Sequence, residues 1–212
     1  MTGTDMQKPL KLGMVGGGEG AFIGAVHRIA ARIDNRFSLV AGALSSNADR
    51  ALRSGLALGL SEDRIYSDFK EMATKEAARE DGIDAVSIVT PNHMHAPVAK
   101  AFLEAGIHVI CDKPLTAQLE EALELEQTVK SSGKLFVLTH NYTGYPMMRQ
   151  AREMVQNGDL GAIRVVQAEY AQDWLTVPAD DDNKQAAWRT DPKMAGAGAT
   201  VLMTARTLEN LE

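Results

Sequence analysis

The segment "LGMVGGGEGAFIG", residues 12–24, decides the expected fold, because an apolar run passes directly into glycines and then into a helix-like segment. Gly16, Gly18 and Ala21 have the spacing of a dinucleotide-binding turn. Glycines at this spacing permit a tight turn and let a pyrophosphate approach backbone N–H groups at a helix N-terminus. Phe22 and Ile23 follow in the chain and are expected to take part in the same contact. A glycine-rich turn without a ligand is the alternative for an isolated match, but this turn follows the first expected strand and opens a helix, which favours nucleotide binding.

Short apolar runs alternate with longer segments of helical period over about the first 140 residues. The expected strands are Leu10–Val15, Ser38–Leu44, Ile65–Tyr66, Ala85–Thr90, Ile107–Cys111 and Leu135–Thr139. The expected helices are Gly24–Ile33, Ala48–Leu58, Asp68–Arg79, Ala96–Ala105 and Ala117–Ser132, the last capped by Thr116 and ending before Gly133. This alternation is typical of β-α-β units with a parallel sheet covered on both faces. The expected fold class is therefore α/β with a doubly wound parallel sheet.

The pattern changes after His140. A helix is expected over Met147–Gln156, and residues 161–175 then run extended with β-branched and aromatic side chains. This extended segment is longer than the strands before it, so we place a domain boundary near residues 142–146. The expected domains are residues 1–143 and residues 144–212.

The composition narrows the class of protein. Of 212 residues, 45% are hydrophobic and 24% are charged, which is the balance of a folded protein with a sizeable core. The net charge of −6 disfavours nucleic acid and anionic membranes as partners, so small-molecule chemistry is the better expectation. The single cysteine cannot form an internal disulfide. We see no signal peptide and no apolar run of about 18 residues, so the expected location is the cytoplasm.

The second expected strand lacks the acid that usually accepts the ribose hydroxyls of NAD at its carboxyl end. Ser45 and Ser46 stand there instead, and Arg50 follows one helical turn later. These side chains could meet a ribose or a 2′-phosphate, so the cofactor could be NAD or NADP. The alternative is that Ser45 or Asn47 caps the next helix and that Arg50 is a solvated surface charge.

Residues just beyond the carboxyl ends of parallel strands line the crevice where ligands bind in such sheets. After the fourth expected strand these residues are Thr90, Pro91, Asn92 and His95, which are placed to meet a cofactor. After the fifth expected strand the segment "CDKP" places Lys113 at the same crevice. A lysine there can hydrogen-bond a substrate hydroxyl and favour the developing alkoxide during hydride removal. The alternative is a surface lysine in a turn.

The pair His93 and His95 also raises the hypothesis of a metal site. The possible further ligands are Cys111, Asp112, His108 and His140. No set of these residues has the tight spacing of a structural zinc site, so we expect no metal. Cys111 closes an apolar strand, where a thiol is commonly buried and inert, so we do not expect it to act as a nucleophile.

Together these motifs resemble those of the Gfo/Idh/MocA oxidoreductases, which are NAD(P)-dependent enzymes acting mostly on sugars, inositols and related compounds. The resemblance runs from about Leu10 to Thr200 and includes the glycine turn, "TPNHMH", "CDKP", "THNYTGYP" and "QAAWRTDP". It implies an N-terminal Rossmann domain followed by an α+β domain built on an open antiparallel sheet. In the family this second domain carries substrate contacts and often the oligomer interface.

The resemblance also implies roles for individual residues. The pyrophosphate would be held by Gly16, Gly18 and Ala21, and the nicotinamide side would be lined by Thr90, Pro91 and Asn92. Lys113 would lie beside the reacting carbon and is the expected catalytic residue. Further candidates for cofactor contact at the pocket wall are His95, Asp112, Pro114, His140, Asn141, Trp188 and Arg189.

The end of the chain departs from the family pattern. Family members are longer, so the chain is expected to be truncated within its second domain. In the family an aspartate and, one helical turn later, a histidine that acts as general base follow a glycine-rich stretch. Met203 and Thr207 stand at those positions here, and neither side chain accepts a proton at neutral pH. Ordinary divergence, a frame error, a truncated gene copy or an artificial chain end would each produce such a tail.

Two functions from different classes therefore remain open. The first is hydride transfer between a nicotinamide cofactor and a hydroxyl carbon of a sugar, inositol or related polyol, with turnover impaired in this chain. The second is a non-catalytic nucleotide-binding fragment or pseudoenzyme. Full-length family members are expected to be homo-oligomers, and an unfinished sheet exposes strand edges, so this chain is expected to self-associate.

Overall fold

A computed structural model describes residues 8–169 of the chain. Its contacts divide the described chain into two units, one of residues 8–90 and 94–138 and one of residues 91–93 and 139–169. The strands are β1 (Leu10–Gly16), β2 (Phe37–Ala43), β3 (Ala85–Val89), β4 (His108–Cys111) and β5 (Phe136–Leu138). The α-helices are α1 (Phe22–Ile33), α2 (Ala48–Ala57), α3 (Phe69–Ala78), α4 (His95–Glu104), α5 (Leu119–Ser132) and α6 (Pro146–Gln156).

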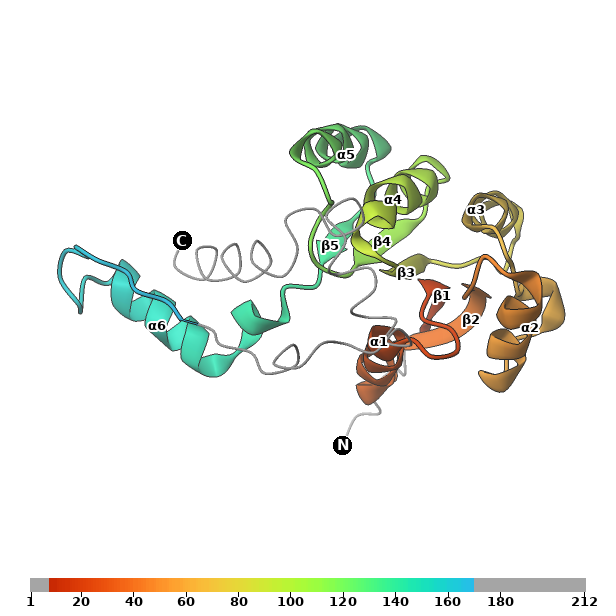
Figure 1. Cartoon of the computed structure of the whole chain (residues 1–212), viewed down its shortest axis with the longest axis horizontal. Helices are drawn as coiled ribbons and strands as arrows, with labels where there is room; N and C mark the ends of the chain where they lie inside the picture. Colours follow the sequence, from red (N-terminus) through yellow and green to blue (C-terminus); the bar gives the residue numbers. More distant parts are fainter. Residues whose placement is uncertain (1–7, 170–212) are drawn as a thin grey trace, which may run out of the picture. The chain divides into compact units, whose positions relative to one another are not determined.

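The first unit is built on a parallel sheet with the strand order β2-β1-β3-β4-β5 (Figure 1). The expected strand Ile65–Tyr66 is reduced to one parallel bridge between Ile65 and Gly42 of β2. If this bridge is counted as a rudimentary strand, the order becomes 3-2-1-4-5-6, which is that of a Rossmann fold. The structure therefore confirms the doubly wound parallel sheet and corrects the strand at Ile65–Tyr66.

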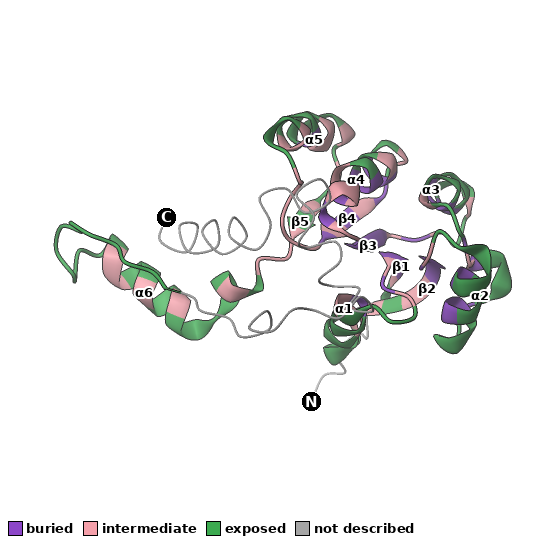
Figure 2. Ribbon diagram, viewed as in Figure 1, coloured by how far each residue is buried: buried purple, intermediate pink, exposed green. Residues whose placement is uncertain are grey.

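Helices cover both faces of this sheet. Helix α1 lies on one face, and α3, α4 and α5 lie over the other (Figure 1). Every residue of β3 is buried, as expected for a central strand of a parallel sheet. The larger core joins the sheet to α3, α4 and α5 and includes Val86, Ile88, Val98 and Phe102. Figure 2 shows that the buried residues concentrate in the central strands and in the helix faces turned toward them.

The start of α5 differs from the expected one. Thr116 does not cap this helix, because the helix begins at Leu119 and its cap is Gln118. The Gln118 side chain and the Glu121 side chain satisfy each other's backbone N–H groups in a capping box. The Thr116 hydroxyl instead donates to the carbonyl of Gln118 at 2.6 Å. The C-terminus agrees with the sequence, because Gly133 follows the last turn with a left-handed φ of 64°.

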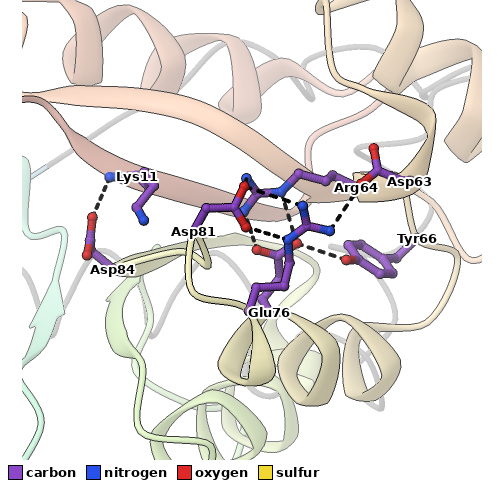
Figure 3. Close-up of polar contacts among 8 residues, drawn as sticks. Lys11, Asp63, Arg64, Tyr66, Glu76, Asp81 and Asp84 are labelled. Atoms are coloured by element: carbon purple, nitrogen blue, oxygen red, sulfur yellow. Dashed lines mark hydrogen bonds and ion pairs between the residues drawn. The ribbon is translucent and has the colours of Figure 1, made fainter.

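A buried polar cluster joins α3 to the segment that leaves β2 (Figure 3). Glu76 of α3 is almost fully buried and accepts from both Arg64 and Tyr66. The distances are 3.1 Å from Arg64 Nε to Glu76 Oε1 and 2.8 Å from the Tyr66 hydroxyl to the same oxygen. A second carboxylate, that of Asp81, lies 3.6 Å from Arg64 Nη1. Burial and the neighbouring Glu76 carboxylate raise the pKa of Tyr66, so this phenol remains a donor at all physiological pH values.

The described part of the second unit contains one α-helix, α6, which has no buried residue. Residues 161–169 were expected to begin an extended, sheet-forming segment, but they form no strand in the described chain. A strand is defined by backbone hydrogen bonds to a partner strand, and the described residues offer this segment no such partner. The expected antiparallel sheet otherwise lies outside the described residues. Within residues 8–169, no helix combines the length and apolarity that crossing a membrane requires.

Candidate functional site

The glycine turn lies at the carboxyl end of β1, between the sheet and α1. Gly16 has a φ of +81°, and a Cβ atom there would lie 2.9 Å from the carbonyl oxygen of Val89. At Gly18 a Cβ atom would lie 2.6 Å from the carbonyl oxygen of Leu44. Contacts this short leave no room for a side chain at either position, so the backbone packs directly against the ends of β3 and β2. The turn predicted from the sequence is therefore built as a closely packed strand-to-helix connection.

The N-terminus of α1 carries no side-chain cap. Its N-cap residue is Ala21, and its first turn contains no acidic residue. Helices α2 and α3 differ, because Asn47 and Asp68 accept hydrogen bonds from their first backbone N–H groups. The unsatisfied N–H groups and the positive end of the helix dipole at α1 are the features that an anion needs. Phe22 is exposed and Ile23 is half-buried in this first turn.

Two side chains that the sequence interpretation missed hold the turn in place. Arg28 of α1 donates from Nη1 to the carbonyl oxygen of Gly17 at 2.9 Å. Ser54 of α2 accepts from the backbone N–H of Glu19 at 3.0 Å. Burial and the neighbouring Arg32 lower the pKa of Arg28. Ser54 lies 35 residues from Glu19, so only the packing of α2 against the turn reveals its contact. Arg28 lies shortly after the quoted segment of residues 12–24.

The carboxyl end of β2 carries the residues that were expected near the ribose. Ser45 is half-buried, and Ser46 and Arg50 are exposed. Asn47 caps α2 by accepting from the backbone N–H of Arg50 at 2.9 Å, which is the capping alternative that the sequence left open. Ser45 Oγ accepts from the backbone N–H of Asn47 at 3.2 Å. The cap involves only the backbone of Arg50, whose side chain is exposed.

Thr90, in the loop after β3, lies next to the glycine turn. Its Cγ2 atom would lie 3.1 Å from a Cβ atom at Gly16. Its hydroxyl oxygen is buried and finds no hydrogen-bond partner among the described residues. A buried hydroxyl without a partner is costly, so a polar ligand group at this point would satisfy it. Of the next two expected site residues, Pro91 is half-buried and Asn92 is buried.

The loop after β4 carries Asp112, Lys113 and Pro114, all of which are half-buried. The backbone N–H of Asp112 donates to Ile88 of β3 at 2.9 Å, so the loop begins at the carboxyl edge of the sheet next to the loop after β3. Cys111 is fully buried as the last residue of β4, and burial raises the pKa of its thiol. A thiol that is neutral and shielded from solvent is a poor nucleophile, which agrees with the inert cysteine expected from the sequence.

A polar chain joins Ser87 of β3, His27 of α1 and Asp112, the residue before Lys113. His27 Nδ1 lies 2.9 Å from Ser87 Oγ, and His27 Nε2 lies 3.8 Å from Asp112 Oδ1. Burial raises the pKa of Asp112, but the His27 side chain and the charge of Lys113 outweigh it, so this pKa lies below its usual range. The sequence interpretation missed Ser87 and His27, which lie 60 residues apart in the chain.

The lowered pKa of Asp112 predicts a pH dependence of stability. Its folded pKa lies below the unfolded value of about 4, so the ionised carboxylate stabilises the fold above that value and the contribution is lost as pH falls through the folded pKa. We expect Asp112→Asn to lower the free energy of unfolding at neutral pH and the difference from wild type to shrink as the pH falls below the unfolded value of about 4. Urea unfolding followed by circular dichroism at several pH values measures this, and an unchanging difference would contradict it.

His95 was expected to meet the cofactor directly, and the structure corrects this prediction. The side chain is fully buried as the first residue of α4. Its Nδ1 atom lies 2.6 Å from the carbonyl oxygen of Pro114, and its Nε2 atom lies 2.9 Å from the carbonyl oxygen of Thr90. Burial lowers the pKa of His95, while the two carbonyl oxygens act in the opposite direction. Both ring nitrogens therefore face the protein backbone rather than a ligand.

The remaining expected residues lie in the second unit or outside the described residues. Asn141 is exposed in a 3-10 turn of the second unit, and His140 precedes it. Trp188 and Arg189 lie outside the described residues. Among the residues that the structure does describe, no group of three or more histidine, cysteine, aspartate or glutamate side chains could hold a metal ion.

Comparison with known proteins decides the family. A family described as "Oxidoreductase family, NAD-binding Rossmann fold" (GFO_IDH_MocA) matches residues 10–142, and the GFO/IDH/MocA C-terminal domain matches residues 148–205. The chain belongs to the Gfo/Idh/MocA oxidoreductase family. Among curated proteins, it is 41% identical over 195 residues to the uncharacterized oxidoreductase YfiI of Bacillus subtilis, covering 90% of this chain and 49% of that protein.

Two further relatives of this Gfo/Idh/MocA chain carry functional descriptions. The levoglucosan dehydrogenase of Pseudarthrobacter phenanthrenivorans is 31% identical over 195 residues, covering 90% of this chain and 47% of that protein. The crystal structure of an inositol dehydrogenase homolog complexed with NAD+ from Azotobacter vinelandii matches with a TM-score of 0.90 and 38% identity, covering 96% of this chain and 53% of the other. The chain thus spans about half the length of the relatives it matches.

Proposed function

We propose that this chain is the cofactor-binding half of an NAD(P)-dependent oxidoreductase that acts on a hydroxyl carbon of a sugar, inositol or related polyol. The observation that carries the proposal is the uncapped N-terminus of α1 behind a glycine turn whose backbone has no room for side chains. The unpartnered Thr90 hydroxyl adds a second polar group at the same edge of the sheet. A relative that acts on levoglucosan and a structural neighbour described as an inositol dehydrogenase homolog support the substrate class.

The residues of the chain have distinct parts in this proposal. The turn around Gly16, Gly18 and Ala21 would bind the pyrophosphate, and Thr90 would donate to or accept from the nicotinamide half. The bound nicotinamide ring supplies the hydride acceptor. Lys113 would hold the substrate hydroxyl and stabilise negative charge on its oxygen as the hydride passes to the nicotinamide and the hydroxyl proton passes to solvent water. The Asp112 carboxylate, kept ionised by its lowered pKa, would attract the Lys113 ammonium group and hold it near the end of β4.

The alternative is a nucleotide-binding chain without turnover. Its support is the sequence around Met203 and Thr207, where the family resemblance implies an aspartate and a histidine base and where neither residue present accepts a proton at neutral pH. An assay of NAD+ and NADP+ reduction over a panel of sugars and polyols separates the two functions. Robust turnover would establish the oxidoreductase, and nucleotide binding with negligible turnover would establish the alternative.

The cofactor preference gives a direct test of the nucleotide site. We expect the chain to bind NADH and NADPH, measured by fluorescence titration, because no acid at the end of β2 repels a 2′-phosphate. If the exposed Arg50 contacts that phosphate, Arg50→Ala should weaken NADPH binding about three- to tenfold and leave NADH binding unchanged.

Arg36→Ala is the matched control for Arg50→Ala, because Arg36 is also exposed but precedes β2 at its opposite end. Equal losses for both nucleotides would show that Arg50 does not read the 2′-phosphate. Failure of the wild-type chain to bind either nucleotide would contradict the proposed function itself.

A further inference from the structure

His95 spans the two loops that carry the expected nicotinamide-side residues. Its Nε2 atom faces the carbonyl oxygen of Thr90 after β3, and its Nδ1 atom faces the carbonyl oxygen of Pro114 after β4. Pro114 directly follows Lys113 in the chain. The imidazole itself is fully buried, so neither solvent nor a cofactor reaches it.

The sheet alone does not hold these two loops together. The register between β3 and β4 ends at the pair Ile88 and Cys111, and the bond from the Asp112 N–H to Ile88 follows directly. The imidazole lies between the two loops beyond that point, with its nitrogens 2.6 and 2.9 Å from the two carbonyl oxygens. A neutral ring carries one N–H, so it donates to one of these carbonyl oxygens at a time. A hydrogen bond in a buried, low-dielectric environment is stronger than one in water, so this bridge restricts how far the loops can separate.

We propose that His95 is a positioning residue, which fixes the Lys113 loop against Thr90 and so shapes the nicotinamide half of the site without touching the cofactor. The inference rests on the proposed cofactor binding. His95 would thus affect the nicotinamide half of the site, whereas the residues of the glycine turn would bind the pyrophosphate. Loss of the bridge should therefore affect one half of the dinucleotide and spare the other.

The experiment compares two ligands that differ by the nicotinamide group. Affinities for NADH and for ADP-ribose, which lacks nicotinamide, are measured by isothermal titration calorimetry on the wild-type chain and on His95→Gln. The glutamine amide nitrogen takes the approximate place of Nε2 and can donate to the Thr90 carbonyl, but no atom of the new side chain takes the place of Nδ1 beside the Pro114 carbonyl. We expect the NADH affinity to fall about three- to tenfold, as for the loss of one hydrogen bond, and the ADP-ribose affinity to stay unchanged.

His108→Gln is the matched control. His108 also bonds to backbone, since its Nδ1 atom accepts from the Leu135 N–H at 2.9 Å, but it lies at the opposite end of β4. This variant should leave both affinities unchanged. A purely structural role of His95 would lower the stability and move both affinities together or neither.

Each remaining outcome decides a different point. If the wild-type chain binds neither ligand, the proposed cofactor binding fails. If it binds both and His95→Gln leaves the NADH affinity unchanged, the positioning role is wrong. If wild-type NADH and ADP-ribose affinities are equal, the loops do not bind nicotinamide and the inference is also overturned.

A measurement on the wild-type chain covers the case in which His95→Gln does not fold. Hydrogen exchange is followed for peptides containing Thr90 and for peptides containing Lys113, with each ligand. NADH should slow exchange in both loops together, and ADP-ribose should slow neither. Protection of one loop without the other would show that the bridge does not couple them.

Discussion

Glu76→Ala is expected to lower the free energy of unfolding by about 3–5 kcal/mol, the loss typical of a buried ion pair that loses one partner. The carboxylate is almost fully buried and accepts from Arg64 and from the Tyr66 hydroxyl (Figure 3). After the change, a buried guanidinium keeps only the Asp81 carboxylate at 3.6 Å, and the buried phenol loses its acceptor. Both groups would lack water to replace what they lose. Urea unfolding followed by far-ultraviolet circular dichroism measures the loss.

Glu71→Ala on the same helix is the matched control. Glu71 pairs with Lys75 at 2.7 Å one helical turn away, but the Glu71 and Lys75 side chains are 47% and 61% exposed. Exposed pairs of this kind contribute about 0.3–0.5 kcal/mol, so the control should change stability little. The contrast isolates burial, because both changes remove a glutamate from α3. Equal effects of the two variants would contradict the structural role assigned to the buried cluster.

The parallel sheet was predictable from the sequence because its central strands are locally unambiguous. Every residue of the run Ala85–Val89 except Ser87 is apolar, and every position is buried, so burial on both faces follows from its composition. The same reasoning does not predict the structure at Ile65, which was expected to lie in a strand but forms a single bridge. It lies beside the edge strand β2, and whether an edge segment forms a strand or a single bridge depends on tertiary packing that its own residues do not encode.

The candidate site was predictable where spacing carries the chemistry. Gly18 follows from the motif because only the backbone fits beside Leu44. The burial of His95 does not follow, since a polar residue after a strand can face the crevice or the core, and the choice depends on carbonyl groups at residues 90 and 114. The contact of His27 with Ser87 likewise joins α1 to β3 across 60 residues, and no local pattern signals it.

Gly18→Ala is expected to lower the affinity for NADH about 10- to 100-fold, and the affinity for ADP-ribose by the same factor. The added methyl group would lie 2.6 Å from the Leu44 carbonyl oxygen and 2.9 Å from Ser54 Oγ. Neither atom can retreat easily, because Leu44 continues β2 and Ser54 accepts from the Glu19 N–H. The turn must move outward instead, so its backbone N–H groups would lose their alignment with the pyrophosphate. Hydrogen bonds to a charged group contribute about 1.5–3 kcal/mol, and losing one gives a change of this size.

Gly144→Ala is the control that separates this effect from the general cost of replacing a glycine. A Cβ atom at Gly144 would meet no atom of residues 8–169 within 4 Å, so both affinities should remain at the wild-type value. Urea unfolding of each variant confirms that binding is compared between folded chains. The paired loss of NADH and ADP-ribose also separates Gly18→Ala from His95→Gln, for which only NADH binding should weaken. Unchanged affinity in a folded Gly18→Ala chain would place the nucleotide somewhere other than the glycine turn, because no pyrophosphate bound there could tolerate the displaced backbone.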